Sequence, residues 1–334
     1  MTLSGRPLLD NRRDAELFVD RERELADLSA ALRRQLNVLV SGDAGIGKTS
    51  LLHALIYRER AVAHDSAFTY IRAEGIADGE ELLATVAAAV SGTAPATAGG
   101  TGALLGILAE HAQAARTGSG DWSPQVMVVD DVTAAAGHAL FGQLRDELWS
   151  LGYQWVVAVR SEDRGGLSLP PADAFFEHEI VLAPLPLSAA VEFLGHRVTA
   201  WAPAVVQKLA EAIGGNPRLL LDAARTVAGD PDQVDDILDA ISRRDAAITR
   251  AGRPEAMVAA ELTALGAASA SDEALLSRLG WTRSRAVQVL TRLEELGLVR
   301  GEDVKLGRGR PRKVYRLTPP SEFEMSLPRT KMTR

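Results

Sequence analysis

The chain has 334 residues, which exceeds the size of one ordinary domain, so two or three domains are expected. It contains no cysteine, and this excludes disulfide bonds, thiolate metal sites and a cysteine nucleophile. The N-terminal sequence lacks the apolar core of a signal peptide, and no segment approaches the roughly 18 apolar residues that a membrane-spanning helix needs. We therefore expect a multidomain protein of the cytoplasm.

The net charge of −7 is distributed unevenly along the chain. Residues 281–334 contain 13 Lys and Arg residues against 6 Asp and Glu residues, so residues 1–280 carry 14 more acidic than basic side chains. An acidic body with a basic C-terminal end indicates that one module contacts a polyanion while the rest binds other ligands. A solvated basic tail without a partner is the alternative.

The first 40 residues predict a loose segment, a helix and a strand. Residues 1–16 are polar and are expected to be loose. In the next segment Leu25, Leu28 and Leu32 recur at a spacing that places them on one face of a helix. The apolar run Leu36–Val40 then predicts a buried strand.

A complete G-x-x-x-x-G-K-[ST] phosphate-binding loop follows this strand. Its glycines allow the backbone N–H groups to point at phosphates, Lys48 neutralises the β and γ oxygens, and the Thr49 hydroxyl ligates Mg²⁺. The helix that opens at Lys48 adds its positive end. The expected nucleotide contacts are Gly42, Asp43, Ala44, Gly45, Ile46, Gly47, Lys48, Thr49 and Ser50.

Further apolar runs predict an α/β domain with a parallel sheet. Two of them, Gln125–Asp131 and Gln154–Arg160, are continuous enough to be buried on both faces, as central parallel strands are. The other expected elements are a strand at Ala67–Ala73, a helix at Gly79–Val90, a loop at Ser91–Gly102 and a strand at Glu179–Leu182.

Two acids end the strand at Gln125–Asp131. Asp130 is expected to hold Mg²⁺ or its water shell opposite the phosphate loop. Asp131 is expected to orient the attacking water as general base, and slow hydrolysis follows because Asp is shorter than the usual Glu. A helix N-cap is the alternative reading of Asp131.

From about Ser188 to Ile248 the pattern is helical, and residues 255–318 form a separate unit. Thr282 caps a helix that runs to about Leu296, with Val287, Leu290 and Leu293 expected to face inward. Arg and Gln side chains on the outer face of such a helix suit base edges in the major groove of DNA. These outward residues are Arg283, Ser284, Arg285, Gln288 and Arg292.

The segments Leu298–Arg300 and Val314–Leu317 are expected to pair as a hairpin with a basic tip. The tip contains Arg308-Gly309-Arg310-Pro311, which resembles the core of an AT-hook, and arginines in such an extended strand fit a narrow minor groove. Arg312 and Lys313 add to this predicted DNA contact. A basic loop on a module that binds protein remains the alternative.

The ordered motifs resemble those of the AAA+ and STAND superfamily of P-loop ATPases over about residues 17–230. Phe18–Leu25 resembles the box that abuts the adenine in that family, which implies a nucleotide contact for Arg21. Asp130-Asp131 resembles Walker B, and Arg160 occupies the sensor 1 place. Leu182–Leu185 followed by Ser188 resembles the entry to the lid, and Gly214–Arg218 matches a G-N-P motif.

This resemblance implies further site residues. Arg218 stands where a sensor 2 arginine reaches the γ-phosphate, next to Pro217, and exposed charges are the alternative reading of both Arg218 and Arg160. Family members assemble side by side and donate an arginine to the neighbouring site, for which Arg164 is the nearest candidate. A solvent-facing turn explains the sequence around Arg164 equally well.

The resemblance also implies a fold, namely a five-stranded parallel sheet of order 5-1-4-3-2 with helices on both faces, a helical lid and a C-terminal winged helix-turn-helix. The C-terminal module resembles the winged helix domains of bacterial repressors and origin-binding initiators. The expected divisions are a flexible segment at 1–16, the ATPase core at 17–185, the lid at 186–250, the winged helix at 255–320 and a basic tail at 321–334.

Three functions fit these motifs. The first is an ATPase, with ATP and Mg²⁺ as cofactors, that controls its assembly on double-stranded DNA as a homo-oligomer or with a partner AAA+ subunit, as initiators do. The second is a STAND-type nucleotide switch in transcription or defence, although the long C-terminal repeat array usual in such proteins is missing from this sequence. The third is a target-selection ATPase of a mobile element, which would share every motif.

Overall fold

The computed structural model describes residues 3–62, 68–76, 78–92, 100–117, 125–228, 234–265, 267–304 and 312–318. The chain forms two compact units. The core unit comprises Ser4–His196 and Gly214–Arg218, and the helical unit comprises Met1–Leu3, Arg197–Ile213 and Leu219–Arg334. The first helix after residue 186, α9 (Leu187–Gly195), belongs to the core unit and not to the helices that follow it.

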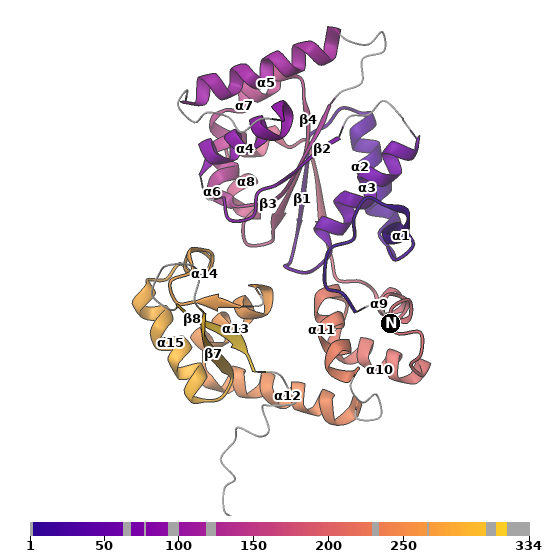
Figure 1. The fold of residues 1–334 in the computed structure, drawn as a ribbon, viewed down its shortest axis with the longest axis vertical. Coiled ribbons are helices and arrows are strands. Elements are labelled where there is room, and N and C mark those ends of the chain that lie inside the picture. The colour runs from indigo at the N-terminus through magenta and orange to yellow at the C-terminus, as the bar shows by residue number, and fades with distance from the viewer. Residues whose placement is uncertain are drawn as a thin grey trace, which may run out of the picture. The chain divides into compact units, whose positions relative to one another are not determined.

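A five-stranded parallel sheet forms the centre of the core unit (Figure 1). The strand order β2-β3-β4-β1-β5 confirms the order 5-1-4-3-2 implied by the resemblance. The central strands are apolar and buried because helices cover both faces of the sheet. The strands are β1 (Val38–Gly42), β2 (Phe68–Arg72), β3 (Val126–Val132), β4 (Gln154–Arg160) and β5 (His178–Leu182).

Alternation along each strand divides the core into two apolar layers. Val38 and Val40 pack against α2 (Glu22–Arg33) and α3 (Lys48–Val62), whereas Leu39 contributes to the layer on the other face. In Figure 1 the first pair of helices lies on one side of the sheet and α4, α5 and α7 lie on the other. Further helices of the core unit are α4 (Gly79–Ser91), α5 (Gly100–Thr117), α6 (Ala134–Gly137), the π-helix η2 (His138–Gln143), α7 (Arg145–Leu151), α8 (Arg164–Leu167) and the 3₁₀-helix η3 (Ala172–Phe175).

A β-bulge interrupts the pairing of β3 with β4 between Val129 and Val132. Strict alternation would turn Val132 toward the α3 face, yet this side chain is buried in the opposite layer with Val129. The extra residue is Asp131, whose φ of 58° is left-handed. The bulge therefore returns Val132 to the apolar layer. The backbone at Asp131 departs from the regular strand conformation.

The N-terminal segment differs from the loose chain expected for residues 1–16. Residues 12–15 form the short helix α1 (Arg12–Ala15), and Asp14 within it is 1% exposed. Both oxygens of Asp14 accept hydrogen bonds from Arg6, and the Leu9 N–H donates to one of them. These bonds hold the pKa of Asp14 well below its usual range, with the Arg6 side chain as the largest cause. Two further hydrogen bonds attach this segment to α3: the Leu8 N–H donates to Ser50 Oγ at 3.2 Å, and Arg60 donates to Asp10.

In the described part of the chain, no helix of either unit has the length and apolarity required to cross a bilayer.

The first helices of the helical unit are amphipathic, with Leu209 of α10 and Leu220 of α11 fully buried. They are α10 (Pro203–Ile213), α11 (Pro217–Val227) and α12 (Val234–Ala251), of which α11 has its first two residues in the core unit.

Three helices and a three-stranded antiparallel sheet end the described chain. We call residues 253–318 the C-terminal module. Its sheet has the order β6-β8-β7, with β7 and β8 paired as an antiparallel hairpin after α15 (Figure 1). The strand β6 was not expected from the sequence. The elements are α13 (Arg253–Leu265), β6 (Ala268–Ser269), α14 (Glu273–Leu279), α15 (Arg283–Glu295), β7 (Val299–Val304) and β8 (Arg312–Leu317).

The inward face of α15 corrects one expectation. Leu290 and Leu293 are buried as expected, but Val287 is 41% exposed. Ala286 and Val289 are buried in its place, so the inward set follows the spacing i, i+3, i+4 and i+7 from residue 286. Val287 lies one helical step outside this stripe.

Candidate functional site

The phosphate loop joins β1 to α3 as its sequence predicts. Gly45 has a φ of 78° and Gly47 a φ of 107°, which favour glycine at both positions. Lys48 is 8% exposed and its Nζ donates to the carbonyl oxygens of Gly42 at 2.7 Å and Asp43 at 3.0 Å. Burial lowers the pKa of Lys48, while Asp131 and Asp130 oppose this shift. The ammonium group is therefore held under the loop and close to both acids.

A hydroxyl and a carboxylate meet beside the loop. Thr49 Oγ1 donates to Asp130 Oδ2 at 2.6 Å, and Asp130 is 3% exposed at the end of β3. Both groups supply the oxygen ligands that Mg²⁺ prefers. In the described residues no cluster of three His, Cys, Asp or Glu side chains could hold a metal ion. The donor set therefore fits the metal expected from the sequence.

A third group reaches the same carboxylate oxygen. Tyr70 Oη, from β2, donates to Asp130 Oδ2 at 2.8 Å. Burial raises the pKa of Tyr70, and the adjacent Asp130 charge raises it further. Sequence reasoning missed this residue because a tyrosine in an apolar strand carries no motif.

Asp131 and Arg160 are paired with each other. Arg160 Nε donates to Asp131 Oδ1 at 2.9 Å, and Nη2 donates to Oδ2 at 3.2 Å. Burial alone would lower the pKa of Arg160, but the hydrogen bonds and the charge of Asp131 outweigh it, so the pKa is raised. The two residues expected to orient water and to sense phosphate thus occupy one bidentate ion pair at the ends of neighbouring strands.

The G-N-P segment packs on the phosphate loop within the core unit. Asn216 Nδ2 donates to the Ala44 carbonyl oxygen at 3.0 Å, and the Arg218 N–H donates to Asn216 Oδ1 at 3.1 Å. A Cβ on Gly45 would lie 2.5 Å from Arg218 Cβ, so the chain segments are in close contact. Pro217 lies between these residues at the start of α11. The nucleotide contacts that the resemblance implies at Pro217 and Arg218 thus lie beside the loop, next to Asn216, which is 172 positions from Ala44 in sequence.

Two other predicted arginines make contacts within the core unit. Arg21 has a φ of 75°, is 6% exposed, and donates from Nη1 to Glu24 Oε1 at 2.8 Å and from Nη2 to the Ala183 carbonyl oxygen. Arg164 Nε and Nη2 donate to the two carboxylate oxygens of Glu179. Arg21 therefore joins the expected adenine box to the end of β5, and Arg164 is paired inside its own chain.

The predicted DNA contacts fall into three groups: exposed side chains of α15, side chains outside the described residues, and side chains paired with carboxylates. Arg283, Ser284 and Gln288 are exposed on α15, as expected. Arg285 is also exposed, with its guanidinium 4.7 Å from the centre of the Trp281 ring. Arg308 and Arg310 lie outside the described residues, as does the side chain of Arg312.

Two of the predicted DNA contacts are tied to carboxylates. Arg292 Nε lies 3.3 Å from an oxygen of Glu255, a buried residue of α13, and Lys313 Nζ donates to Glu294 Oε2 at 2.8 Å. Sequence reasoning missed Glu255 because its partner is 37 positions away and neither residue belongs to a motif. These two basic side chains are therefore partly neutralised inside the module.

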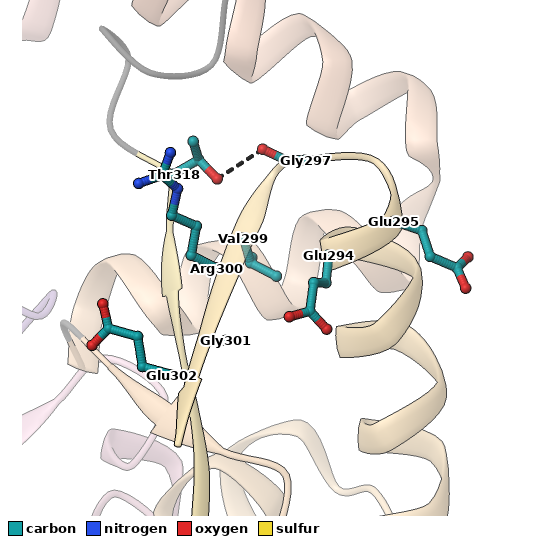
Figure 2. Close-up of a pocket in the computed structure, with 8 residues that line it drawn as sticks. All are labelled: Glu294, Glu295, Gly297, Val299, Arg300, Gly301, Glu302 and Thr318. Carbon is teal, nitrogen blue, oxygen red and sulfur yellow. Dashed lines mark hydrogen bonds between the residues drawn. The ribbon is translucent and has the colours of Figure 1, made fainter. Parts of the chain in front are cut away.

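A shallow hollow lies between the end of α15 and β7. Figure 2 shows three carboxylates on its rim, with Arg300 among them, and the Thr318 hydroxyl donating to the Gly297 carbonyl oxygen at 2.7 Å. The hollow is lined by Glu294, Glu295, Gly297, Val299, Arg300, Gly301, Glu302 and Thr318. Three carboxylates against one arginine among these lining residues make the hollow unsuited to phosphate.

Comparisons with known proteins agree with this geometry. Residues 17–157 match the family described as AAA ATPase domain. No curated protein sequence matches the chain. Two solved structures share its fold, each with a TM-score of 0.52. The ORC1 protein of Aeropyrum pernix in complex with DNA is 19% identical, with coverage of 90% of this chain and 89% of that one. Cdc6p of Pyrobaculum aerophilum is 16% identical, with coverage of 92% of this chain and 94% of that one.

A third structure is similar along nearly its whole length. It is a Walker-type ATPase of Pyrococcus abyssi, with 17% identity, a TM-score of 0.54, and coverage of 96% of this chain and 98% of that one. At such identities these similarities concern the fold, whereas the family match concerns the residues of the core unit. The chain is therefore an ATPase in which residues 17–157 match an AAA ATPase domain, and its fold is similar to those of the ORC1 and Cdc6 proteins.

Proposed function

We propose that this chain is an ATP-dependent DNA-binding protein in which Mg-ATP, bound by the core unit, controls assembly on duplex DNA through the C-terminal module. The observation that carries the proposal is the convergence of Lys48, the Thr49–Asp130 pair and residues 216–218 on one backbone loop. These groups come from three separate parts of the chain, and together they match what a nucleoside triphosphate with Mg²⁺ requires.

The residues around the loop have distinct roles in nucleotide binding. The loop N–H groups and Lys48 bind phosphate oxygens, and Lys48 exchanges its bonds to the Gly42 and Asp43 carbonyls for bonds to phosphate. Thr49 and Asp130 would hold Mg²⁺, which neutralises phosphate charge when bound. Arg218 and Pro217, fixed beside Gly45, extend the site toward the γ-phosphate.

Slow hydrolysis follows from the Asp131–Arg160 pair. A general base must present a free carboxylate oxygen to water, and both oxygens of Asp131 accept hydrogen bonds from Arg160. Arg160 must therefore turn toward another anion, the γ-phosphate in this proposal, before Asp131 orients water. Turnover depends on a rearrangement and is slow.

The DNA half of the proposal is supported by the exposed polar face of α15 and by the basic sequence between β7 and β8. Arginine and glutamine near the start of such a helix suit base edges, and the basic segment suits phosphates or a narrow minor groove. The similar ORC1 structure of Aeropyrum pernix is described as a complex with DNA. Sensing of the nucleotide state by Arg218, and by Arg164 across a subunit interface, would link ATP to DNA occupancy.

Sedimentation and ATP turnover, each with and without duplex DNA, test the proposal. ATP, ADP and a non-hydrolysable analogue are compared with the full chain and with Lys48→Ala. We expect ATP-dependent assembly and DNA-stimulated turnover that Lys48→Ala abolishes. A monomer that binds nucleotide tightly and responds to no DNA would overturn the DNA half and leave the nucleotide half intact.

The ion pair of Asp131 with Arg160 also favours a second candidate, a STAND-type nucleotide switch in transcription or defence. In such a switch the bound nucleotide holds one conformation and hydrolysis is rare. The same experiment separates the two candidates, because a switch retains its nucleotide through sedimentation and shows no stimulation by DNA.

A further inference from the structure

The carboxylate of Asp130 is fixed from two sides by hydroxyl groups. Thr49 Oγ1 approaches Oδ2 from α3 at 2.6 Å, and Tyr70 Oη approaches the same oxygen from β2 at 2.8 Å. Thr49 belongs to the phosphate-loop motif, whereas Tyr70 belongs to no motif. With both hydroxyls donating to Oδ2, no hydrogen bond to the other oxygen, Oδ1, is recorded among the described residues.

The sheet determines where Tyr70 can reach. Strand β2 pairs in parallel with β3, with Tyr70 opposite Val128 and Arg72 opposite Asp130. Tyr70 and Val128 therefore face the α3 side, and the long phenol side chain extends along the strand direction to the carboxylate two positions further on. A smaller side chain at this position of β2 would not reach Asp130.

The ring of Tyr70 is itself held by α3. His53 stands one helical turn after Thr49, is 8% exposed, and lies with its ring centre 4.4 Å from that of Tyr70. No hydrogen bond to His53 Nδ1 is found in the described part of the chain, and the nearest carboxylate, on Asp10, is 3.9 Å away. Thus His53 acts on Tyr70 through ring packing, and one helix places both Thr49 and the support of Tyr70.

We propose that Tyr70 is a positioning residue of the Mg²⁺ site, which holds Asp130 in the orientation that binds the metal and thereby sets the metal affinity of the nucleotide complex. This inference rests on the proposed function of the core unit. A carboxylate held only by Thr49 can rotate about its side-chain torsions, and the metal must then order it on binding. Hydrogen-bonding partners of metal ligands commonly change metal affinity by about 10-fold to 100-fold when they are removed.

Tyr70→Phe is the variant that tests the inference, because it deletes the hydroxyl and keeps the ring against His53. A fluorescent ATP analogue is titrated with Mg²⁺ and, separately, the analogue alone is titrated in EDTA. We expect the Mg²⁺ concentration for half-maximal enhancement of binding to rise about 10-fold, while affinity in EDTA stays unchanged. Tyr57→Phe, which removes a partly exposed hydroxyl elsewhere on α3, is the matched control and should match the parent chain.

Each other outcome has one meaning. An unchanged Mg²⁺ dependence in Tyr70→Phe overturns the inference. Equal weakening with and without Mg²⁺ also overturns it, because that result indicates a general disturbance of the loop. Failure of the proposed function would give a different result. Either the parent chain would bind no analogue, or Lys48→Ala would bind it as well as the parent does.

Discussion

The nucleotide side of the core unit and the basic face of the C-terminal module both carry predicted binding residues, but they use them differently. Around the phosphate loop, Lys48, Thr49 and Asp130 are bonded to one another or to the loop backbone. On α15 the basic side chains project separately, and Arg292 is tied to Glu255. A site built on backbone geometry needs fixed neighbours, whereas the contacts of a surface with the phosphates of a polyanion depend mainly on its density of charge.

The largest expected effect concerns Lys48. Lys48→Ala should weaken ATP binding by on the order of 100-fold, because it removes a cation that is buried under the loop. Equilibrium titration with a fluorescent nucleotide measures it. Lys208→Ala, an exposed lysine of α10, is the control and should bind as the parent does. Equal binding by the parent and by Lys48→Ala would contradict the idea of a preformed phosphate site.

Substitution of a loop glycine should affect folding as well as binding. In Gly45→Ala a left-handed φ of 78° would carry a Cβ only 2.5 Å from Arg218 Cβ, so we expect a loss of about 1–3 kcal/mol in the free energy of unfolding. Urea denaturation measures this loss. Gly106→Ala, at an exposed position of α5 where an added Cβ would meet nothing within 4 Å beyond its own helix, should instead be neutral or stabilising by up to about 1 kcal/mol. Comparable losses in both variants would show that Gly45 has no special role.

Removal of arginines from the basic tip of the C-terminal module should weaken DNA binding in proportion to the number of charges removed. Arg308→Ala with Arg310→Ala should weaken DNA binding about 10-fold and reduce the slope of log affinity against log salt by about two. Arg250→Ala with Arg253→Ala removes the same number of charges from α12 and α13 and provides the comparison. Affinity measured across a salt series distinguishes them, and an intact slope in the first pair would refute the assignment of the basic tip to DNA.

The smallest expected effect distinguishes Arg292, which pairs with a buried carboxylate, from the arginines that are expected to contact DNA. Arg292→Ala leaves the buried carboxylate of Glu255 without its ion pair and should cost about 1 kcal/mol of stability, a modest loss because Arg292 is 62% exposed. Arg283→Ala, on the exposed start of α15, should change stability by less than about 0.5 kcal/mol while it weakens DNA binding. Thermal unfolding and DNA titration of both variants measure this difference. Identical behaviour of the two would show that the Glu255 pair contributes nothing.

Sequence reasoning predicted the elements of the core unit well where the signal lies in consecutive residues. The run Gln154–Arg160 became β4 without change, and the loop–helix junction at Lys48 is where its motif placed it. Strand order came from resemblance alone, because periodicity says which residues are buried and not which strands are neighbours. Helix α5 was missed, since its apolar positions follow a Gly- and Ala-rich stretch that reads as loop.

The sequence did not predict side-chain pairings between distant parts of the chain, and the reason is physical. Asp131 and Arg160 are 29 positions apart, and Tyr70 and Asp130 are 60 apart. Both pairs depend on which strands are adjacent and on a bulge that no propensity signals. Sequence reasoning thus named Asp130, Asp131 and Arg160 one by one as candidate residues, and it predicted neither of these pairings.

The bulge in β3 has a consequence for protein engineering. On a regular strand, Asp131 would occupy the inward position that Val132 now fills, and a charged group would enter an apolar layer at a cost of several kcal/mol or with loss of its charge. The insertion of one residue lets two consecutive carboxylates serve different partners, Thr49 and Arg160, with neither side chain in the apolar layer. A transplant of this acid pair into another sheet must therefore carry the irregular backbone with it, because the two side chains alone do not encode their separation.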